Sequence, residues 1–222
     1  MQAPNKLKAF KLPLFILIIG ALMVAYLFPN QKHELPVYGP KDFHPDLVDT
    51  EVQLVTSHHT VSDFKLTNQN GELITQSTYD NKIYVTDFFF TRCPSICPIM
   101  SNNMGKLQKE FINHDDVMLL SMSVTPEMDS VPVLKKYARR NGVLDSKWNI
   151  TTGDKKHIYD LARGSFFATL DYGDGGLQDF IHTPNFVLVD KKKQIRGVYN
   201  GTDSDEIQRL IEDIKSLIHG LN

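Results

Sequence analysis

The feature that most constrains the fold of this chain is an apolar run that ends in two cysteines, KIYVTDFFFTRCPSICPIMS at residues 82–101. Residues 83–90 are rich in β-branched and aromatic side chains, which predicts a buried strand. Cys93 and Cys97 are the only cysteines in the 222-residue sequence, and each precedes a proline. Because proline is tolerated at the start of a helix, we expect a helix to begin at Pro98 with Cys97 at its cap.

The position of the two thiols indicates their chemistry. The positive end of a helix dipole favours the thiolate form of a nearby cysteine. Thiolates bind soft ions such as Cu(I) and Zn(II) or hold iron–sulfur clusters, and neighbouring thiols also cycle to a disulfide. A purely structural disulfide is a weaker alternative, because closing so short a loop removes little entropy from the unfolded chain. The pair therefore predicts a metal site or a redox-active dithiol.

A second feature is an uncharged apolar segment at residues 12–28, which follows Lys6, Lys8 and Lys11. Its length is at the short end of the range for a transmembrane helix, and the positive-inside rule leaves the lysines in the cytoplasm. No small-residue cleavage site follows, which favours an uncleaved anchor over a signal peptide. The flanking residues lack the Arg- and Ser-rich character of an organelle transit peptide. We therefore expect residues 1–11 in the cytoplasm, a single-pass anchor in a bacterial inner membrane, and the remainder on the periplasmic side.

Composition narrows the class of partner. The chain has 24 basic and 26 acidic residues and a net charge of -2, which provides no electrostatic footprint for nucleic acid. Residues 29–60 are polar and contain several prolines, so we expect a tether between the membrane and one domain at 61–222. Four histidines in the tether are expected to be solvated loop residues, with transient copper capture as the alternative: His33, His44, His58 and His59.

The region after the tether alternates between strands and helices. Residues 63–74 contain an Asn-Gly turn between alternating apolar residues, which predicts a β-hairpin. Further strands are expected at 117–124, 148–151, 185–190 and 195–200, and helices at 132–140, 155–163 and 207–218. An α/β pattern with an antiparallel edge predicts a central mixed sheet flanked by helices. This order of elements is similar to the thioredoxin fold.

Two local features strengthen the similarity to thioredoxins. Asp87 lies six residues before Cys93 inside the apolar strand, at the position of the buried acid of thioredoxins. Thr183-Pro184 opens a strand where thioredoxin-like proteins place a cis-proline beside their cysteines. A buried carboxylate under a dithiol can accept a proton during thiol exchange, or it can hydrogen-bond the loop backbone. Both roles are open for Asp87.

The proline register also makes His182 a candidate ligand. If Pro184 faces the cysteine loop, His182 lies only two residues from that contact. An imidazole added to two thiolates suits copper in either oxidation state. The alternative is a loop histidine without a metal. The sequence therefore allows a site of two sulfurs and one nitrogen.

Three segments together carry a resemblance to a known family: FTRCPSICP at 90–98, SVTPEMDSVPVLKKYA at 123–138 and IHTPNFVLVD at 181–190. They resemble the Sco (SenC/PrrC) family of copper-binding proteins over residues 61–220. The resemblance implies a thioredoxin-like domain, membrane tethering, and delivery or redox preparation of the binuclear copper site of cytochrome c oxidase. It also implies copper, as Cu(I) or Cu(II), bound by two cysteines and one histidine. By that resemblance the ligands are Cys93, Cys97 and His182, and the residues near them are Asp87, Arg92 and Asp179.

Three functions follow as hypotheses. The first is a copper metallochaperone, not a turnover enzyme, that passes copper to the copper-bearing subunit of cytochrome c oxidase or to another copper or thiol acceptor. In that case the Gly- and Asp-rich run 171–179 would let His182 swing. The second is a thiol–disulfide oxidoreductase acting on acceptor cysteines, and the third is a peroxidase using Thr91 and Arg92 beside one thiolate. Met100 and Met104 could bind Cu(I), but their spacing is typical of a helix core.

Overall fold

The part of the chain that can be described excludes most of the predicted membrane anchor. The computed structural model describes residues 17–20, 23, 35–42, 59–169 and 180–220. The chain divides into two units, Met1–His33 and Glu34–Asn222. None of the helices in the described ranges is both long and apolar enough to cross a bilayer. Most of the segment 12–28 lies outside those ranges.

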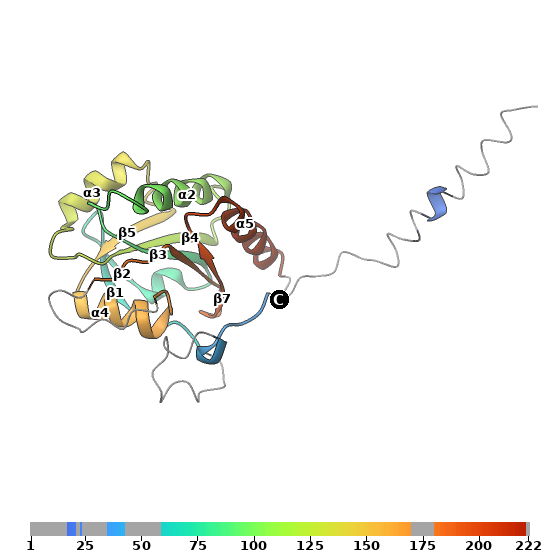
Figure 1. The fold of residues 1–222 in the computed structure, drawn as a ribbon, viewed down its shortest axis with the longest axis horizontal. Coiled ribbons are helices and arrows are strands. Elements are labelled where there is room, and N and C mark those ends of the chain that lie inside the picture. The colour runs from blue at the N-terminus through green and yellow to red at the C-terminus, as the bar shows by residue number, and fades with distance from the viewer. Residues whose placement is uncertain (1–16, 21–22, 24–34, 43–58, 170–179, 221–222) are drawn as a thin grey trace, which may run out of the picture. The chain divides into compact units, whose positions relative to one another are not determined.

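Within the described residues, the larger unit is built on a seven-stranded mixed sheet with the strand order β2-β1-β5-β4-β3-β6-β7 (Figure 1). The strands are β1 (Lys65–Asn68), β2 (Leu73–Thr75), β3 (Ile83–Phe89), β4 (Val117–Ser123), β5 (Trp148–Thr152), β6 (Asn185–Val189) and β7 (Ile195–Asn200). The central strand β3 runs parallel to β4 and antiparallel to β6. All seven residues of β3 are buried, because both faces of the sheet are covered. The strand that precedes the cysteines therefore lies in the middle of the sheet.

Helices cover both faces of the sheet (Figure 1). One face packs against α2 (Cys97–Glu110), α3 (Val131–Arg140) and α5 (Ser204–Ile218). The other face packs against α4 (Lys155–Asp160), the π-helical turn Leu161–Ser165 and the short 3-10 turn Gln76–Tyr79. The predicted mixed sheet, its flanking helices and its N-terminal hairpin are confirmed. Met100 and Met104 are fully buried in the core under α2, as their spacing predicted.

Two local expectations near the cysteines are wrong. The helix α2 begins at Cys97, one residue earlier than predicted, because Ile96 has right-handed helical φ and ψ and serves as the N-cap. Pro98 then occupies the second helical position, where its missing N–H has no intrahelical partner to lose. No peptide bond between described residues is cis, so the Thr183–Pro184 bond is trans.

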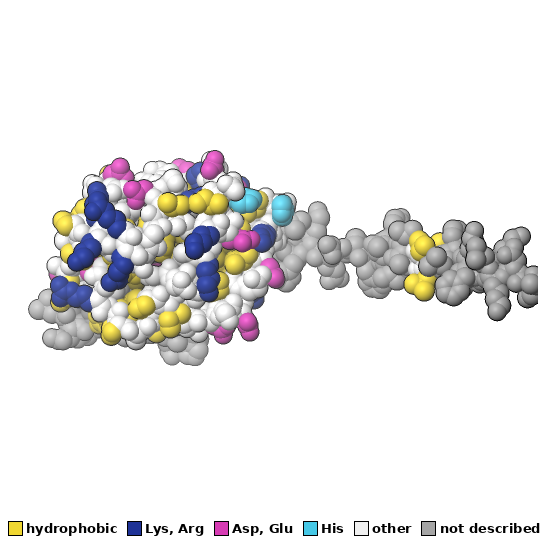
Figure 2. Space-filling model, turned by 90° about the horizontal axis from the view of Figure 1, so that it is seen from above, with side chains coloured by type: hydrophobic (Ala, Val, Ile, Leu, Met, Phe, Trp, Pro, Cys, Tyr) yellow, Lys and Arg dark blue, Asp and Glu magenta, His cyan; other side chains and the backbone are white. Residues whose placement is uncertain are grey.

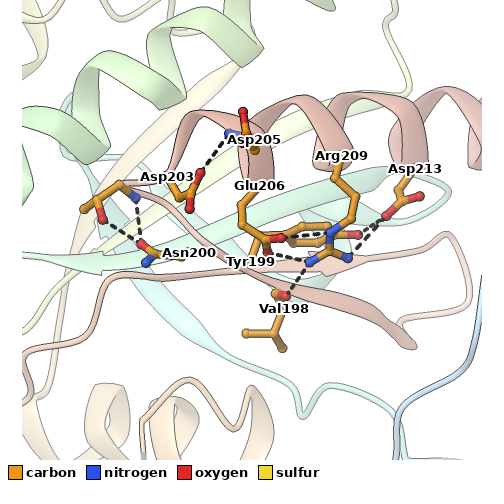
Figure 3. A network of polar contacts seen from close by, with 9 residues as sticks. Val198, Tyr199, Asn200, Asp203, Asp205, Glu206, Arg209 and Asp213 are labelled. Carbon is orange, nitrogen blue, oxygen red and sulfur yellow. Dashed lines mark hydrogen bonds and ion pairs between the residues drawn. The ribbon is translucent and has the colours of Figure 1, made fainter.

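The C-terminal helix is held on the sheet edge by a network around Tyr199 of β7 (Figure 3). The Tyr199 hydroxyl donates to Asp213 Oδ2 at 2.7 Å, and the Arg209 guanidinium lies 4.2 Å from the centroid of the Tyr199 ring. Arg209 also pairs with Glu206 one turn earlier in α5. These contacts fix α5 against β7 and close one side of the core that supports α2.

The packed domain starts earlier in the chain than the sequence suggested. Of residues 29–60, assigned to a tether, the structure describes 35–42 and 59–60. Leu35 is buried, and the Tyr38 N–H donates to the Ile195 carbonyl of β7 at 2.9 Å. The Arg196 guanidinium donates hydrogen bonds to the Leu35 and Pro36 carbonyls. Buried backbone carbonyls need such donors when they are not paired in a sheet. The segment 35–42 is therefore bound to β7.

His59 is also bound to the domain and is not a solvated loop residue as expected. Its Nε2 atom lies 2.7 Å from the Ser165 carbonyl oxygen, and its ring lies 4.7 Å from the Phe167 ring. Burial lowers the pKa of His59, against the opposing effect of the Ser165 contact. The other three tether histidines lie outside the described residues.

Candidate metal centre

The loop that carries the cysteines is anchored at both ends to the sheet. At its start the Val124 N–H donates to the Phe89 carbonyl at 2.9 Å, which continues the pairing of β3 with β4. The Cys93 N–H then donates to the Phe90 carbonyl at 3.3 Å, so the chain turns directly after β3. At its end the loop enters α2 at Cys97. Both thiols are thereby held at the point where the central strand passes into a helix.

A buried carboxylate, Asp129, fixes the start of this loop. Only 1% of Asp129 is exposed, and it accepts hydrogen bonds from the N–H and Oγ1 of Thr91 at 3.1 and 2.6 Å. Ser123 Oγ and Thr125 Oγ1 also donate to it, at 2.6 and 3.0 Å. Asp129 is not among the site residues predicted from the sequence, although it lies in one of the three family-like segments. Its only sequence signal was the surrounding run of Ser and Thr donors.

The two thiols are reduced and adjacent. Cys93 and Cys97 are 7% and 3% exposed, and neither forms a disulfide. The Cys97 N–H donates to Cys93 Sγ across 3.4 Å, and Ser95 Oγ lies 3.6 Å from the same sulfur. The predicted pair of neighbouring thiols at the start of a helix is therefore present in the structure.

The surroundings give the two thiols opposite acidities. Burial on its own raises the pKa of Cys93, but the hydrogen bonds from Cys97 and Ser95 outweigh it and lower that pKa to about 6. Burial, with the neighbouring Cys93 and Asp87, raises the pKa of Cys97 to about 12, against the opposing effect of a backbone hydrogen bond from Phe90. Near neutral pH the site therefore holds one thiolate and one thiol.

Asp87 lies in β3 beneath the cysteine loop and is fully buried. Its Oδ1 atom accepts a hydrogen bond from Ser121 Oγ of β4, and Ser121 Oγ accepts from Trp148 Nε1 at 2.8 Å. Burial raises the pKa of Asp87 to about 7, although the Ser121 hydrogen bond opposes the shift. Asp87 is thus a buried acid that can be protonated at neutral pH, in the position predicted for it.

His182 is exposed and lies beside the cysteine loop. Its ring centroid is 6.2 Å from that of Phe90, and the Phe180 ring is stacked with it at 6.3 Å. In the described ranges, no three or more His, Cys, Asp and Glu side chains are grouped closely enough to hold a metal ion. The structure therefore brings Cys93 and Cys97 together. It places His182 against Phe90, which precedes Cys93 by three positions in the sequence. The run 171–179, with Asp179, lies outside the described residues.

The thiols face a cleft of about 480 Å³. Its walls come from the cysteine loop, including Arg92, and from the C-terminal half of α3, including Tyr137 and Arg140. The Tyr137 hydroxyl forms a hydrogen bond with Ser101 of α2, which ties α3 to the first turn after Cys97. A soft ion or an incoming thiol can reach the sulfurs through this cleft.

The fold and the site define a class of protein: a thioredoxin-like domain with two reduced thiols where the central strand meets a helix. A sequence profile of the SCO1/SenC family matches residues 53–219, which cover most of the chain. The chain belongs to the SCO1/SenC family.

Individual relatives agree with this assignment. The SCO1 protein homolog of Bacillus subtilis is 32% identical over 161 residues, covering 72% of this chain and 83% of the relative. The solved structure of BsSco, a member of the Sco family of cytochrome c oxidase assembly proteins with a disulfide switch, superposes with a TM-score of 0.61. It is 32% identical and covers 72% of this chain and 93% of that one. Copper-bound ScoI of Bradyrhizobium japonicum has the same fold, with a TM-score of 0.57, 23% identity, and coverage of 71% and 99%.

Proposed function

We propose that this protein is a membrane-anchored copper metallochaperone for assembly of the copper site of cytochrome c oxidase. The observation that carries the proposal is the pair of reduced, adjacent thiols of Cys93 and Cys97 at the base of a cleft. Two thiolates are a donor set selective for soft ions such as Cu(I). A role of BsSco in oxidase assembly and the copper held by the Bradyrhizobium relative support the same function here.

In this proposal copper is cargo bound by Cys93 Sγ, Cys97 Sγ and the His182 imidazole. Cys93 is already a thiolate near neutral pH, whereas Cys97 must release a proton when it binds the ion. His182 is exposed and held only by ring contacts with Phe90 and Phe180, so it can approach or leave the sulfurs without breaking a hydrogen bond to the described residues. A ligand that leaves easily opens a position for a ligand from the acceptor protein.

The membrane location is also part of the proposal. The uncharged segment 12–28 with its three preceding lysines supports a single-pass anchor, with the domain on the periplasmic side of a bacterial inner membrane. The acceptor would then be the copper-bearing subunit of the oxidase or another copper or thiol protein facing the same compartment. Fractionation of cells expressing the full chain, with protease added from the periplasmic side, tests this orientation.

Copper titration tests the ligands. The reduced full-length protein is titrated with Cu(I) against a chromophoric chelator, alongside Cys93→Ser, Cys97→Ser and His182→Ala. We expect one equivalent bound by the wild type, a loss of at least about a hundredfold in affinity for each cysteine variant, and about tenfold for His182→Ala. His59→Ala is the matched control, because His59 binds Ser165 on the other face of the sheet. Unchanged affinity in either cysteine variant would remove the assigned site.

A second function, thiol–disulfide oxidoreductase, is favoured by the unequal acidity of the two thiols. Cys93 has the low pKa of an attacking thiolate, and Cys97 has the raised pKa of a thiol that needs a base. Asp87, with a pKa of about 7, is the nearest candidate proton acceptor. Catalytic reduction of a protein disulfide in the absence of copper, lost in Cys93→Ser, would establish this activity. A rate no faster than that of a free dithiol would exclude it.

A further inference from the structure

The helix that forms one wall of the cleft carries charge of one sign. α3 (Val131–Arg140) contains four basic residues and no acidic residue, and all four are exposed: Lys135, Lys136, Arg139 and Arg140. Arg92 of the cysteine loop adds a fifth exposed cation beside them. The chain as a whole has a net charge of -2, so this positive charge is a local feature. Figure 2 views the molecule from the side of α2, α3 and α5, and Lys and Arg side chains gather at the end where α3 lies.

No described carboxylate forms an ion pair with the basic residues of α3 or with Arg92, although Asp145 lies near enough to Lys135 for an electrostatic attraction. Some other exposed lysines of the described region do pair with carboxylates, such as Lys156 with Asp160 and Lys215 with Glu110. The Arg140 guanidinium lies 5.2 Å from the Tyr137 ring centroid. Like charges gathered on one face repel each other, and the same positive field attracts an acidic partner.

Three of these five cations, Arg92, Lys136 and Arg140, line a groove that leads to the thiols. The 480 Å³ cleft over Cys93 adjoins a second hollow of about 550 Å³ along α3. The second hollow adds Pro132, Val133 and Lys136 to the lining. None of the described residues that line the two hollows is acidic, and four of them line both: Thr91, Arg92, Tyr137 and Arg140. The second hollow is mainly apolar and the cleft over the thiols is more polar, and both have cations in their lining.

We infer that this groove, called here the α3 groove, binds an acidic, extended segment of a partner protein. This partner is the one that exchanges thiols or copper with Cys93. The inference rests on the proposed function and names the chemistry of the partner. A concave groove fits a peptide chain better than a lipid surface, which contacts only exposed rims. Carboxylates beside the partner's cysteine would meet Arg92, Lys136 and Arg140 while that cysteine reaches the thiols. Complementary charge of this kind accelerates association and sets the register of the complex.

Thiol exchange with short peptides tests the inference without copper. Each peptide carries a central cysteine as a mixed disulfide with 2-thiopyridine, flanked by glutamates, glutamines or lysines. The Cys93 thiolate attacks the peptide sulfur, a Cys93–peptide disulfide forms, and the bond to 2-thiopyridine breaks and releases the chromophore. Cys97 then attacks Cys93 Sγ, which forms the Cys93–Cys97 disulfide and frees the peptide thiol. The measured quantity is the second-order rate of chromophore release by the reduced full-length protein in non-ionic detergent.

At low ionic strength we expect the glutamate peptide to react about tenfold faster than the glutamine peptide, and the lysine peptide to react more slowly than both. The preference should vanish in about 0.5 M salt. The preference for the glutamate peptide should reverse in the double variant Lys136→Glu/Arg140→Glu. It should persist in the matched control Lys106→Glu/Lys109→Glu, because these two sites on α2 lie outside the groove. For each protein the rate with the glutamine peptide is the reference, and the preference is the ratio of the other two rates to it.

Equal rates for the three peptides with wild-type protein would overturn the inference. So would a preference that survives charge reversal in the α3 groove. Another outcome is that the wild type binds vesicles of anionic lipid that the groove variant does not bind, while the peptides show no preference. That result would assign the basic face to a membrane. Copper binding is measured separately, so loss of the proposed function would leave the peptide result standing as evidence for a thiol-exchange partner.

Discussion

The backbone N–H of Cys97 donates a hydrogen bond to Cys93 Sγ, with 3.4 Å between the nitrogen and the sulfur. This contact exists because α2 begins at Cys97, so that one of its free N–H groups points at the preceding thiol. It stabilises the thiolate of Cys93, whereas at Cys97 burial outweighs the one backbone hydrogen bond, from Phe90, that would stabilise a thiolate there. The difference between two neighbouring cysteines is thus a consequence of where the helix starts.

Alkylation should reveal this difference directly. In the reduced, metal-free protein we expect iodoacetamide to label Cys93 first, with a pH profile whose midpoint lies near 6. Below the midpoint the thiol is protonated and the rate falls; above it the rate is constant. Cys97 should stay unlabelled up to about pH 9, because its pKa is raised to about 12. Mass spectrometry of the labelled peptides identifies the site, and first labelling at Cys97 would refute the assignment.

Asp87 should make stability depend on pH. Its folded pKa of about 7 lies above the ordinary value of 3.8, so between these values the folded state keeps a proton that the unfolded state releases. The wild type therefore loses stability as pH rises from about 4 to about 7, and the loss is complete above the folded pKa. Relative to Asp87→Asn, that loss should be on the order of 4 kcal/mol.

Chemical denaturation of wild type and Asp87→Asn at a series of pH values measures this effect. The difference between the two unfolding free energies cancels groups that titrate alike in both proteins. A difference that does not change between pH 4 and pH 8 would show that Asp87 is not held in a protonated form.

Much of the fold was predictable because its signals are local. The apolar run at 83–89 and the cysteines after it lie within twenty residues, and alternation and helical spacing located the other strands and helices. The predicted start of α2 was wrong by one residue. Proline is accepted at either of the first two helical positions, and the sequence does not distinguish them. The predicted membrane anchor and the three-ligand copper site stay predictions.

The supports of the site were not predictable, because they depend on contacts between distant residues. Thr91 donates hydrogen bonds to Asp129, which lies 38 positions later in the chain. Arg196 donates a hydrogen bond to the Leu35 carbonyl, from which it is separated by 161 positions. Neither contact leaves a periodic pattern in the sequence. The ring contacts of His182 with Phe90 and Phe180 are of the same kind.

Removing the Asp129 carboxylate should weaken the domain strongly. Asp129→Ala leaves the buried donors of Thr91, Ser123 and Thr125 without their acceptor, and we expect a loss of about 2–4 kcal/mol in the free energy of unfolding. Asp154→Ala is the matched control, because Asp154 caps α4 at an exposed site with one backbone hydrogen bond and should cost about 1 kcal/mol. Equal losses in urea denaturation would mean that Asp129 does not organise the loop.

The segment 35–42 should detach when Arg196 is removed. Arg196 pairs with Asp190 at 2.8 Å, and both side chains are 4% exposed. Arg196→Ala leaves that carboxylate buried and unpaired, and we expect a loss of about 3–5 kcal/mol. Limited proteolysis of the folded variant should then cut between residues 35 and 42. Lys191→Ala, which breaks the exposed pair with Asp116, should cost under about 1 kcal/mol and leave the cleavage pattern unchanged; cleavage equally slow in the Arg196 variant would contradict the docking role.

We propose that one copper ion is bound by two sulfurs and one imidazole nitrogen. X-ray absorption at the copper edge of the reduced, Cu(I)-loaded full-length protein tests this ligand set. We expect two sulfur scatterers and one nitrogen in the wild type, loss of the nitrogen in His182→Ala, and an unchanged spectrum in His59→Ala. A wild-type spectrum without the nitrogen, or one that His182→Ala leaves unaltered, would contradict it.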